Sequence, residues 1–110
     1  MQRIQLEIQQ EQIQILYLYA AIGMLQAIID GTVSADVGIW TLGVPKTWQT
    51  LADKQYATSE VIEIFQEFDE LSALSEISQE FLRAEGIKLR DRLYAELQKH
   101  TDPTWSVNWK

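Results

Sequence analysis

The sequence predicts a mainly α-helical fold, in which a single-domain helical bundle surrounds a long buried N-terminal helix and the chain termini form a small two-stranded β-ribbon. Apolar residues recur every three or four positions through most of residues 13–97, as in amphipathic helices. The two ends instead alternate apolar and polar residues, which is the period of a strand. The 110 residues, 46% of them hydrophobic, suffice for one core, so residues 1–110 are expected to form one domain.

Both chain ends, QRIQLEI and TWSVNWK, carry this strand-like alternation. A two-stranded ribbon is marginal in water unless another element covers it. We therefore expect the ends to pair and to lay their apolar faces on the first helix, with the C-terminal tryptophans covering the core. A disordered C-terminal tail is the alternative. The apolar residues of the two faces are Ile4, Leu6 and Ile8, and Trp105, Val107 and Trp109.

The first helix is expected from about residue 10 to residue 30. Its apolar side chains form two stripes, so most of its surface should be buried. Gly23 would allow another helix to approach closely, and Gly31 suits the left-handed position after the helix end. The stripes are Ile13, Leu16, Tyr17, Ala20, Met24 and Ile28, and Ile15, Leu18, Ile22, Leu25 and Ile29.

This uncharged stretch, residues 13–29, raises the question of a membrane span. A span needs about 20 mostly apolar residues. The stretch is shorter and contains Gln14 and Gln26, which favours a buried helix over a transmembrane one.

Two short helices are predicted next. Ser34 suits the N-cap of the first, with Asp36 in its first turn, and Gly43 should end it. Pro45 suits the first turn of the second, over about residues 45–53. Stacking of tryptophans on a ligand is a less favoured interpretation than burial in the core. The apolar side chains expected in the core here are Trp40, Leu42, Trp48 and Leu51.

Two amphipathic helices complete the predicted bundle. Thr58 or Ser59 should cap the first, and Ser75 or Ser78 the second. Gly86 either breaks the second helix or is tolerated within it. The predicted inner faces are Val61, Ile62, Phe65, Phe68, Leu71 and Leu74 in the first, and Ile77, Phe81, Leu82, Leu89, Leu93 and Leu97 in the second.

The composition argues against several classes of function. The formal net charge of -7 disfavours nucleic-acid binding, which needs clustered Lys and Arg. The chain has no cysteine, which removes disulfides, thiolate nucleophiles and Cys-ligated zinc, and a reducing cytoplasm is the expected location. The single histidine, His100, has no evident partner for base catalysis. We therefore expect no enzymatic activity, no cofactor and no metal site.

Acidic residues are concentrated in one part of the chain, because residues 55–82 contain no Lys or Arg. In one interpretation this acidic helix packs beside the basic helix that follows, and the charges pair across their rims. In the other, the acids face outward and attract a basic partner. A divalent-cation site on Glu63, Glu67 and Glu70 is less favoured, since charge runs usually face water. The acids are Glu60, Glu63, Glu67, Asp69, Glu70, Glu76 and Glu80.

The segments GMLQAIIDGTVSADVGIWTLGVPKTWQTL and VIEIFQEFDELSAL resemble a family of small bacterial helical proteins of unknown function, over about residues 23–75. In that family an apolar helix is followed by a short capped helix, a proline, a second short helix and an acidic helix. The resemblance implies a mainly helical cytoplasmic protein without known catalytic residues. By analogy of size and charge, it implies a toxin-immunity or antitoxin role.

The predicted function is therefore a non-enzymatic protein-binding module, in the concrete form of a bacterial immunity or regulatory protein. Its contact face is predicted to contain Glu63, Glu67 and Glu70. The expected partner is a basic protein, and neither a nucleic acid nor a membrane is expected. The alternative is a structural subunit that forms a homodimer through the terminal ribbon or a Trp-bearing surface.

Overall fold

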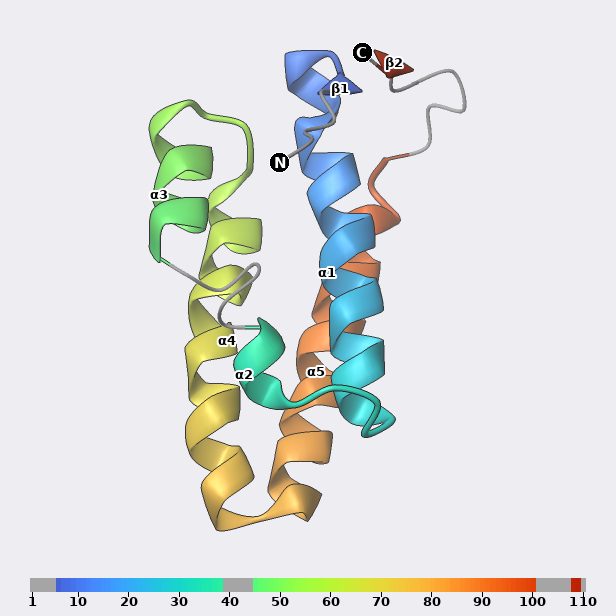
Figure 1. Cartoon of the computed structure of the whole chain (residues 1–110). Coiled ribbons are helices and arrows are strands. Elements are labelled where there is room, and N and C mark those ends of the chain that lie inside the picture. The colour runs from blue at the N-terminus through green and yellow to red at the C-terminus, as the bar shows by residue number, and fades with distance from the viewer. Residues whose placement is uncertain (1–5, 39–44, 101–107, 110) are drawn as a thin grey trace.

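Three long helices form the bundle in the computed structural model, which describes residues 6–38, 45–100 and 108–109 (Figure 1). These helices are α1 (Ile13–Ile29), α4 (Ser59–Ile77) and α5 (Gln79–Leu97). The shorter helices α2 (Ala35–Gly38) and α3 (Pro45–Asp53) lie against α4, and a 3-10 turn, η1 (Gln10–Gln12), leads into α1. The prediction of a mainly helical single domain is confirmed.

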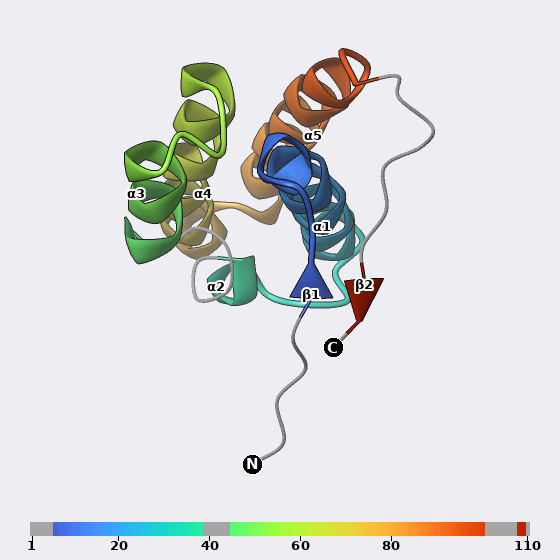
Figure 2. The same ribbon diagram turned by 90° about the horizontal axis from the view of Figure 1, so that it is seen from above.

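The core lies where α1, α4 and α5 meet, since α5 packs against both α1 and α4. Phe65 and Phe68 of α4 are fully buried at its centre, with ring centroids 5.6 Å apart. Viewed from above, α3 and α4 lie on one side of the molecule and α5 and α1 on the other (Figure 2). Of the predicted inner-face residues, Ile77 and Phe81 are instead exposed at the α4–α5 turn.

Both predicted stripes of α1 contribute to the core, and Ile13, Tyr17 and Met24 of the first stripe are half-buried against it. Ile15, Leu18, Leu25 and Ile29 of the second predicted stripe are buried, together with Ala21 and Ile28. Ala20 of the first stripe is exposed, as is the neighbouring Gly23. Most residues of α1 are therefore buried or half-buried as predicted, and Tyr19, Ala20 and Gly23 form its exposed side.

The close approach of two helices occurs at Gly86. A Cβ atom added there would lie 3.1 Å from Cγ1 of Ile29, so the absence of a side chain lets the end of α1 pack directly on α5. Helix α5 continues through Gly86 without a break. At Gly23, by contrast, an added Cβ would meet no atom within 4 Å. The predicted close approach at Gly23 is therefore wrong.

The helix starts follow the predicted caps. The Thr58 hydroxyl accepts a hydrogen bond from the Val61 N–H at 3.4 Å, and the Ser78 hydroxyl accepts one from the Phe81 N–H at 3.3 Å. Helix α3 begins at Pro45 as predicted, and α2 follows Ser34 directly. The predicted end of the earlier short helix at Gly43, together with Trp40 and Leu42, falls outside the described residues.

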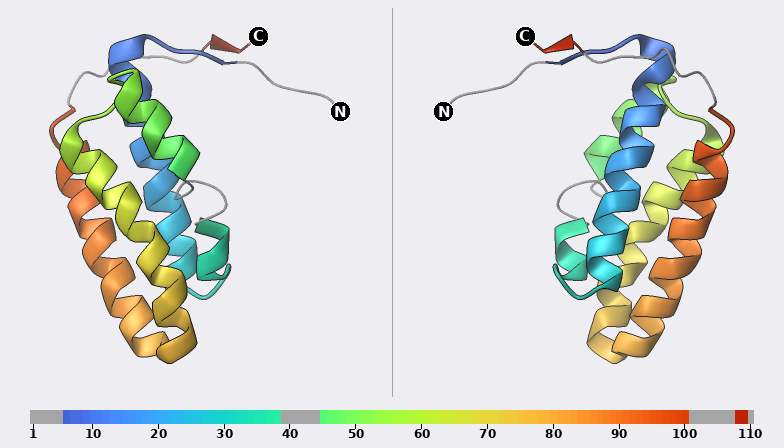
Figure 3. Two further views of the ribbon diagram at one scale, coloured as in Figure 1. Left: turned by 90° about the vertical axis from the view of Figure 1, so that its left-hand side faces the viewer. Right: turned by 90° about the vertical axis from the view of Figure 1, so that its right-hand side faces the viewer.

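Within the described residues, the chain ends pair over two residues in each strand. In β1 (Leu6–Glu7) and β2 (Asn108–Trp109), Leu6 lies opposite Trp109 in an antiparallel pair. Figure 3 shows this pair beyond the end of the helices, not over α1. The remainder of both predicted strands, including Trp105, lies outside the described residues. A terminal ribbon that covers the core is therefore not supported.

Two helices end in the same backbone conformation with different residues. After α1, Gly31 has φ 78°, and after α3, Gln55 has φ 57°. In each case the next N–H bonds to the carbonyl five residues earlier, at 2.9 Å for Thr32 and 2.8 Å for Tyr56. This left-handed position is the one predicted for Gly31, and it favours glycine because a Cβ atom crowds the backbone.

We expect Gln55→Gly to raise the free energy of unfolding by about 1 kcal/mol, because glycine relieves the steric penalty of the left-handed conformation. Gly31→Ala should lower it by a similar amount. Urea denaturation followed by circular dichroism measures both changes. Gln49→Gly, at an exposed position inside α3, is the control and should destabilise by about 1 kcal/mol. Equal destabilisation by Gln55→Gly and Gln49→Gly would contradict the prediction.

Candidate functional site

The predicted contact residues lie along the solvent side of α4. Glu63 and Glu70 are exposed and Glu67 is half-buried. Steps of four and three residues bring the three carboxylates onto one face of the helix. We call this surface, Glu63, Glu67 and Glu70, the acidic face.

Helix α5 supplies one cation to the acidic face. The guanidinium of Arg92 forms an ion pair with Glu67, and its Nη2 lies 3.9 Å from Oε1 of Glu63. Glu70 has no ion pair with any described residue. Pairing across the helix rims therefore occurs at Glu67 and, at longer range, at Glu63, and leaves Glu70 available.

Glu67 and Glu70 also form one rim of a small groove between α4 and α5. The groove has a volume of about 130 Å³, and the lining includes the apolar side chains of Leu71, Leu74 and Leu89. On the α5 side, Nζ of Lys88 lies 3.1 Å from Oε1 of Glu85. The acidic face thus borders a narrow surface where apolar and charged groups meet.

Glu60 continues the acidic face toward the start of α4, and further carboxylates lie on another side of the helix. Glu60, Asp69 and Glu76 are exposed. The pKa of the Glu60 carboxyl is lowered, mainly by a hydrogen bond from its own backbone, while partial desolvation opposes this. Hydrogen bonds from Thr58 and Ser59 and the positive charge of Lys99 lower the pKa further. Glu60 is therefore ionised at neutral pH and adds to the negative charge of α4.

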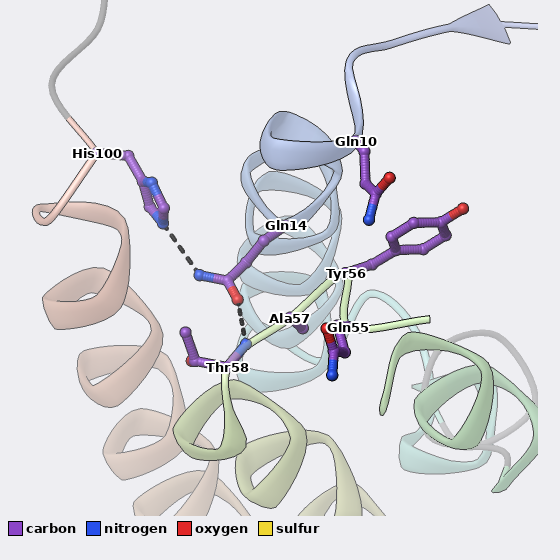
Figure 4. A pocket seen from close by; sticks show the side chains of 7 residues that line it. All are labelled: Gln10, Gln14, Gln55, Tyr56, Ala57, Thr58 and His100. Carbon is purple, nitrogen blue, oxygen red and sulfur yellow. Dashed lines mark hydrogen bonds between the residues drawn. The ribbon is translucent and has the colours of Figure 1, made fainter. Parts of the chain in front are cut away.

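A second candidate site is a pocket beside the starts of α1 and α4, lined mainly by residues that carry polar groups (Figure 4). It has a volume of about 350 Å³. Gln14 of α1 is only 6% exposed, and its Oε1 accepts a hydrogen bond from the Thr58 N–H at 2.6 Å. Its Nε2 lies 3.0 Å from Nε2 of His100. The lining residues are Gln10, Gln14, Gln55, Tyr56, Ala57, Thr58 and His100.

The hydrogen bonds of Gln14 assign a role to His100. Because the amide oxygen of Gln14 is used by Thr58, its NH2 group faces the imidazole. Nε2 of His100 is then placed to accept this hydrogen bond. His100 therefore helps to join α1, the start of α4 and the residues after α5. Sequence reasoning found no partner for His100, although Gln14 is a polar residue in an otherwise apolar stretch.

Gln26 makes a comparable link on α1. Nη1 of Arg90 donates to Oε1 of Gln26 at 3.0 Å, and Nε2 of Gln26 donates to Oδ1 of Asp30 at 3.0 Å. The Arg90 guanidinium also lies 5.6 Å from the centre of the Tyr94 ring. Both glutamines of the uncharged stretch thus form hydrogen bonds from α1 to other parts of the chain, Gln14 to Thr58 and His100 and Gln26 to Arg90.

Within residues 6–38, 45–100 and 108–109, no group of three or more His, Asp or Glu side chains is placed to hold a metal ion. The three carboxylates of the acidic face are among the residues searched. In the same part of the chain, no helix combines the length and the apolar character that crossing a membrane requires.

Comparison of the chain with models of protein families, with curated proteins and with solved structures found no match. The function is therefore inferred from the surfaces described above.

Proposed function

We propose that this chain is a non-enzymatic protein-binding module that recognises a basic protein through the acidic face of α4. The observation that carries this proposal is that all the charged residues of that helix are acidic. Residues Ser59–Ile77 include no Lys or Arg, and their carboxylates are exposed except for the half-buried Glu67. In the described part of the chain, Arg92 is the one cation paired with them.

Such a surface attracts a basic protein over a distance of about 8 Å at physiological ionic strength. The groove beside Glu67 and Glu70 adds apolar contact once the partner has arrived. Electrostatic attraction would then set the association rate, and the contact at the groove would slow dissociation.

The concrete form of this proposal is a cytoplasmic bacterial immunity or regulatory protein. Its support is the acidic charge, the small size and, by analogy, the family resemblance described above. A homodimer formed through the terminal ribbon or a Trp-bearing surface is the alternative. It has less support, because the pair of β1 and β2 lies at the end of the bundle (Figure 3) and comprises two residues of each strand in the described part of the chain.

Replacing Glu63, Glu67 and Glu70 together by glutamine is expected to weaken binding of a basic partner about tenfold, since each lost exposed ion pair contributes roughly 0.5 kcal/mol. The salt dependence of the binding constant should also become flatter. The measurement is fluorescence anisotropy with a labelled basic partner, captured with the wild-type chain and then purified, at low and high ionic strength.

The matched control neutralises three carboxylates outside α4: Asp30→Asn, Asp53→Asn and Asp91→Asn. It makes the same change in net charge but leaves the acidic face intact. The proposal requires the control to bind nearly as tightly as the wild-type chain. If the two triple variants lose the same affinity, only the net charge matters and the acidic face is not the contact surface.

A further inference from the structure

Two large apolar side chains are exposed at the turn between α4 and α5. Ile77 is 75% exposed and Phe81 is 63% exposed. The sequence predicts both on the inner face of the second amphipathic helix. In the structure Ile77 is the last residue of α4, and Phe81 lies about 100° of helix rotation away from the buried Leu82. Helix α1 ends beside Gly86, so the last turn of α4 and the first turns of α5 extend beyond it (Figure 1). No part of α1 therefore covers these two side chains.

Carboxylates flank this apolar pair. Glu76 precedes Ile77 and Glu80 precedes Phe81, and both are exposed. We call Glu76, Ile77, Glu80 and Phe81 the hairpin tip. A hollow of about 500 Å³ begins next to it on α5, lined by Gln79, Glu80, Arg83, Ala84 and Ile87. Arg83 is the basic residue in the lining of this hollow. The other lining residues provide a carboxylate, an amide and apolar side chains.

We propose that the hairpin tip is the apolar anchor of the protein-binding surface and that it receives a basic amphipathic helix of the partner. This inference rests on the proposed function and names the chemistry of the partner segment. An apolar side chain of that segment would lie on Ile77 and Phe81, and its lysines or arginines would face Glu76 and Glu80. An apolar centre inside a charged rim is the usual anatomy of a protein interface.

Charge decides between this occupant and a second copy of the chain. Two tips packed together about a two-fold axis would bring the carboxylates of Glu76 and Glu80 from both copies into one interface. Like charges placed together oppose association. A basic segment instead covers the same apolar pair while neutralising the rim.

The experiment uses a fluorescein-labelled synthetic helix with leucines on one face and lysines on the other. Stopped-flow fluorescence anisotropy gives its association and dissociation rates. The double variant Ile77→Ser and Phe81→Ser should weaken binding at least tenfold through faster dissociation at every salt concentration. Replacing the acidic face by glutamines should instead slow association and flatten the salt dependence.

Tyr94→Ser is the matched control, because Tyr94 is another exposed aromatic residue of α5, 41% exposed. It should change peptide affinity by less than about twofold, as expected for a residue outside the contact. A second control peptide has the same residues in scrambled order, which removes the apolar face, and should bind much more weakly. Circular dichroism establishes that each variant is folded.

Several outcomes would overturn the proposal. One is a wild-type chain that fails to bind the amphipathic helix, or that binds the scrambled peptide equally well. Another is a serine double variant that binds like the wild type while the acidic-face variant is weakened, which leaves the proposed function standing without the hairpin tip. If instead the serine double variant is weakened and the acidic-face variant binds like the wild type, the hairpin tip is the contact and the acidic face is not. A wild-type dimer in analytical ultracentrifugation that Phe81→Ser converts to monomers would identify a second copy as the occupant.

Discussion

Replacing Phe65 by alanine is expected to lower the free energy of unfolding by about 3–5 kcal/mol. The Phe65 ring is fully buried, and its centroid lies 5.6 Å from that of Phe68 and 6.4 Å from that of Tyr17. Truncation removes this burial and leaves a cavity that the surrounding side chains fill only in part. Urea denaturation followed by circular dichroism measures the loss.

Phe81→Ala provides a control with the same chemical change at an exposed position. It should alter the free energy of unfolding by no more than about 0.5 kcal/mol, as surface substitutions usually do. Similar losses at Phe65 and Phe81 would mean that the hairpin tip is covered in solution and that the assignment of the core is wrong.

Replacing Gln14 by leucine is expected to lower the free energy of unfolding by about 1–3 kcal/mol, the effect of leaving a part-buried hydrogen-bonding group without its partner. The variant keeps a side chain of similar size but removes the acceptor of the Thr58 N–H and the donor to His100. Hydrogen exchange at the Thr58 amide gives a direct readout, since that proton should exchange faster.

Gln26→Leu is the control for Gln14→Leu. Gln26 lies on the same helix and also makes two side-chain hydrogen bonds, but it is less buried and its partners reach water. Its replacement should cost about 0.5–1 kcal/mol and should leave exchange at Thr58 unchanged. Unchanged exchange at Thr58 in Gln14→Leu would refute the proposed hydrogen bond.

Local signals in the sequence predicted the helix ends well. Thr58, Ser78 and Gly31 act within one helical turn, through hydrogen bonds to backbone groups that lie near them in the chain. Pro45 is suited to a first turn for an equally local reason, its fixed φ angle. Such signals do not depend on how the helices later pack.

Long-range features could not be predicted in the same way. Gln14 and His100 are 86 residues apart, and their contact depends on the relative position of α1 and α5. The same dependence decides that Gly86, and not Gly23, lies at a helix crossing. For Ile77 and Phe81 the prediction of an inner face is wrong, because the boundary between α4 and α5 falls after Ile77 and the buried face of α5 passes through Leu82 instead of Phe81.

In the candidate site, one feature could be predicted from local spacing and another depended on long-range packing. The spacing of Glu63, Glu67 and Glu70 was enough to place them on one face of α4. Pairing of Glu67 with Arg92 depends on which turn of α5 lies opposite, and the sequence alone left that choice open. Periodicity could therefore predict the acidic face. It could not show that Glu63 and Glu67 pair with Arg92 while Glu70 has no ion pair with a described residue.

The pairing of β1 with β2 has a practical consequence for presenting this molecule to other proteins. Both strands lie at the end of the bundle opposite the α4–α5 turn (Figure 1). A biotin group attached beside either strand would therefore tether the molecule with its far end pointing away from the support. An array prepared in this way would display Ile77 and Phe81 outward in a uniform orientation, whichever strand carries the tether.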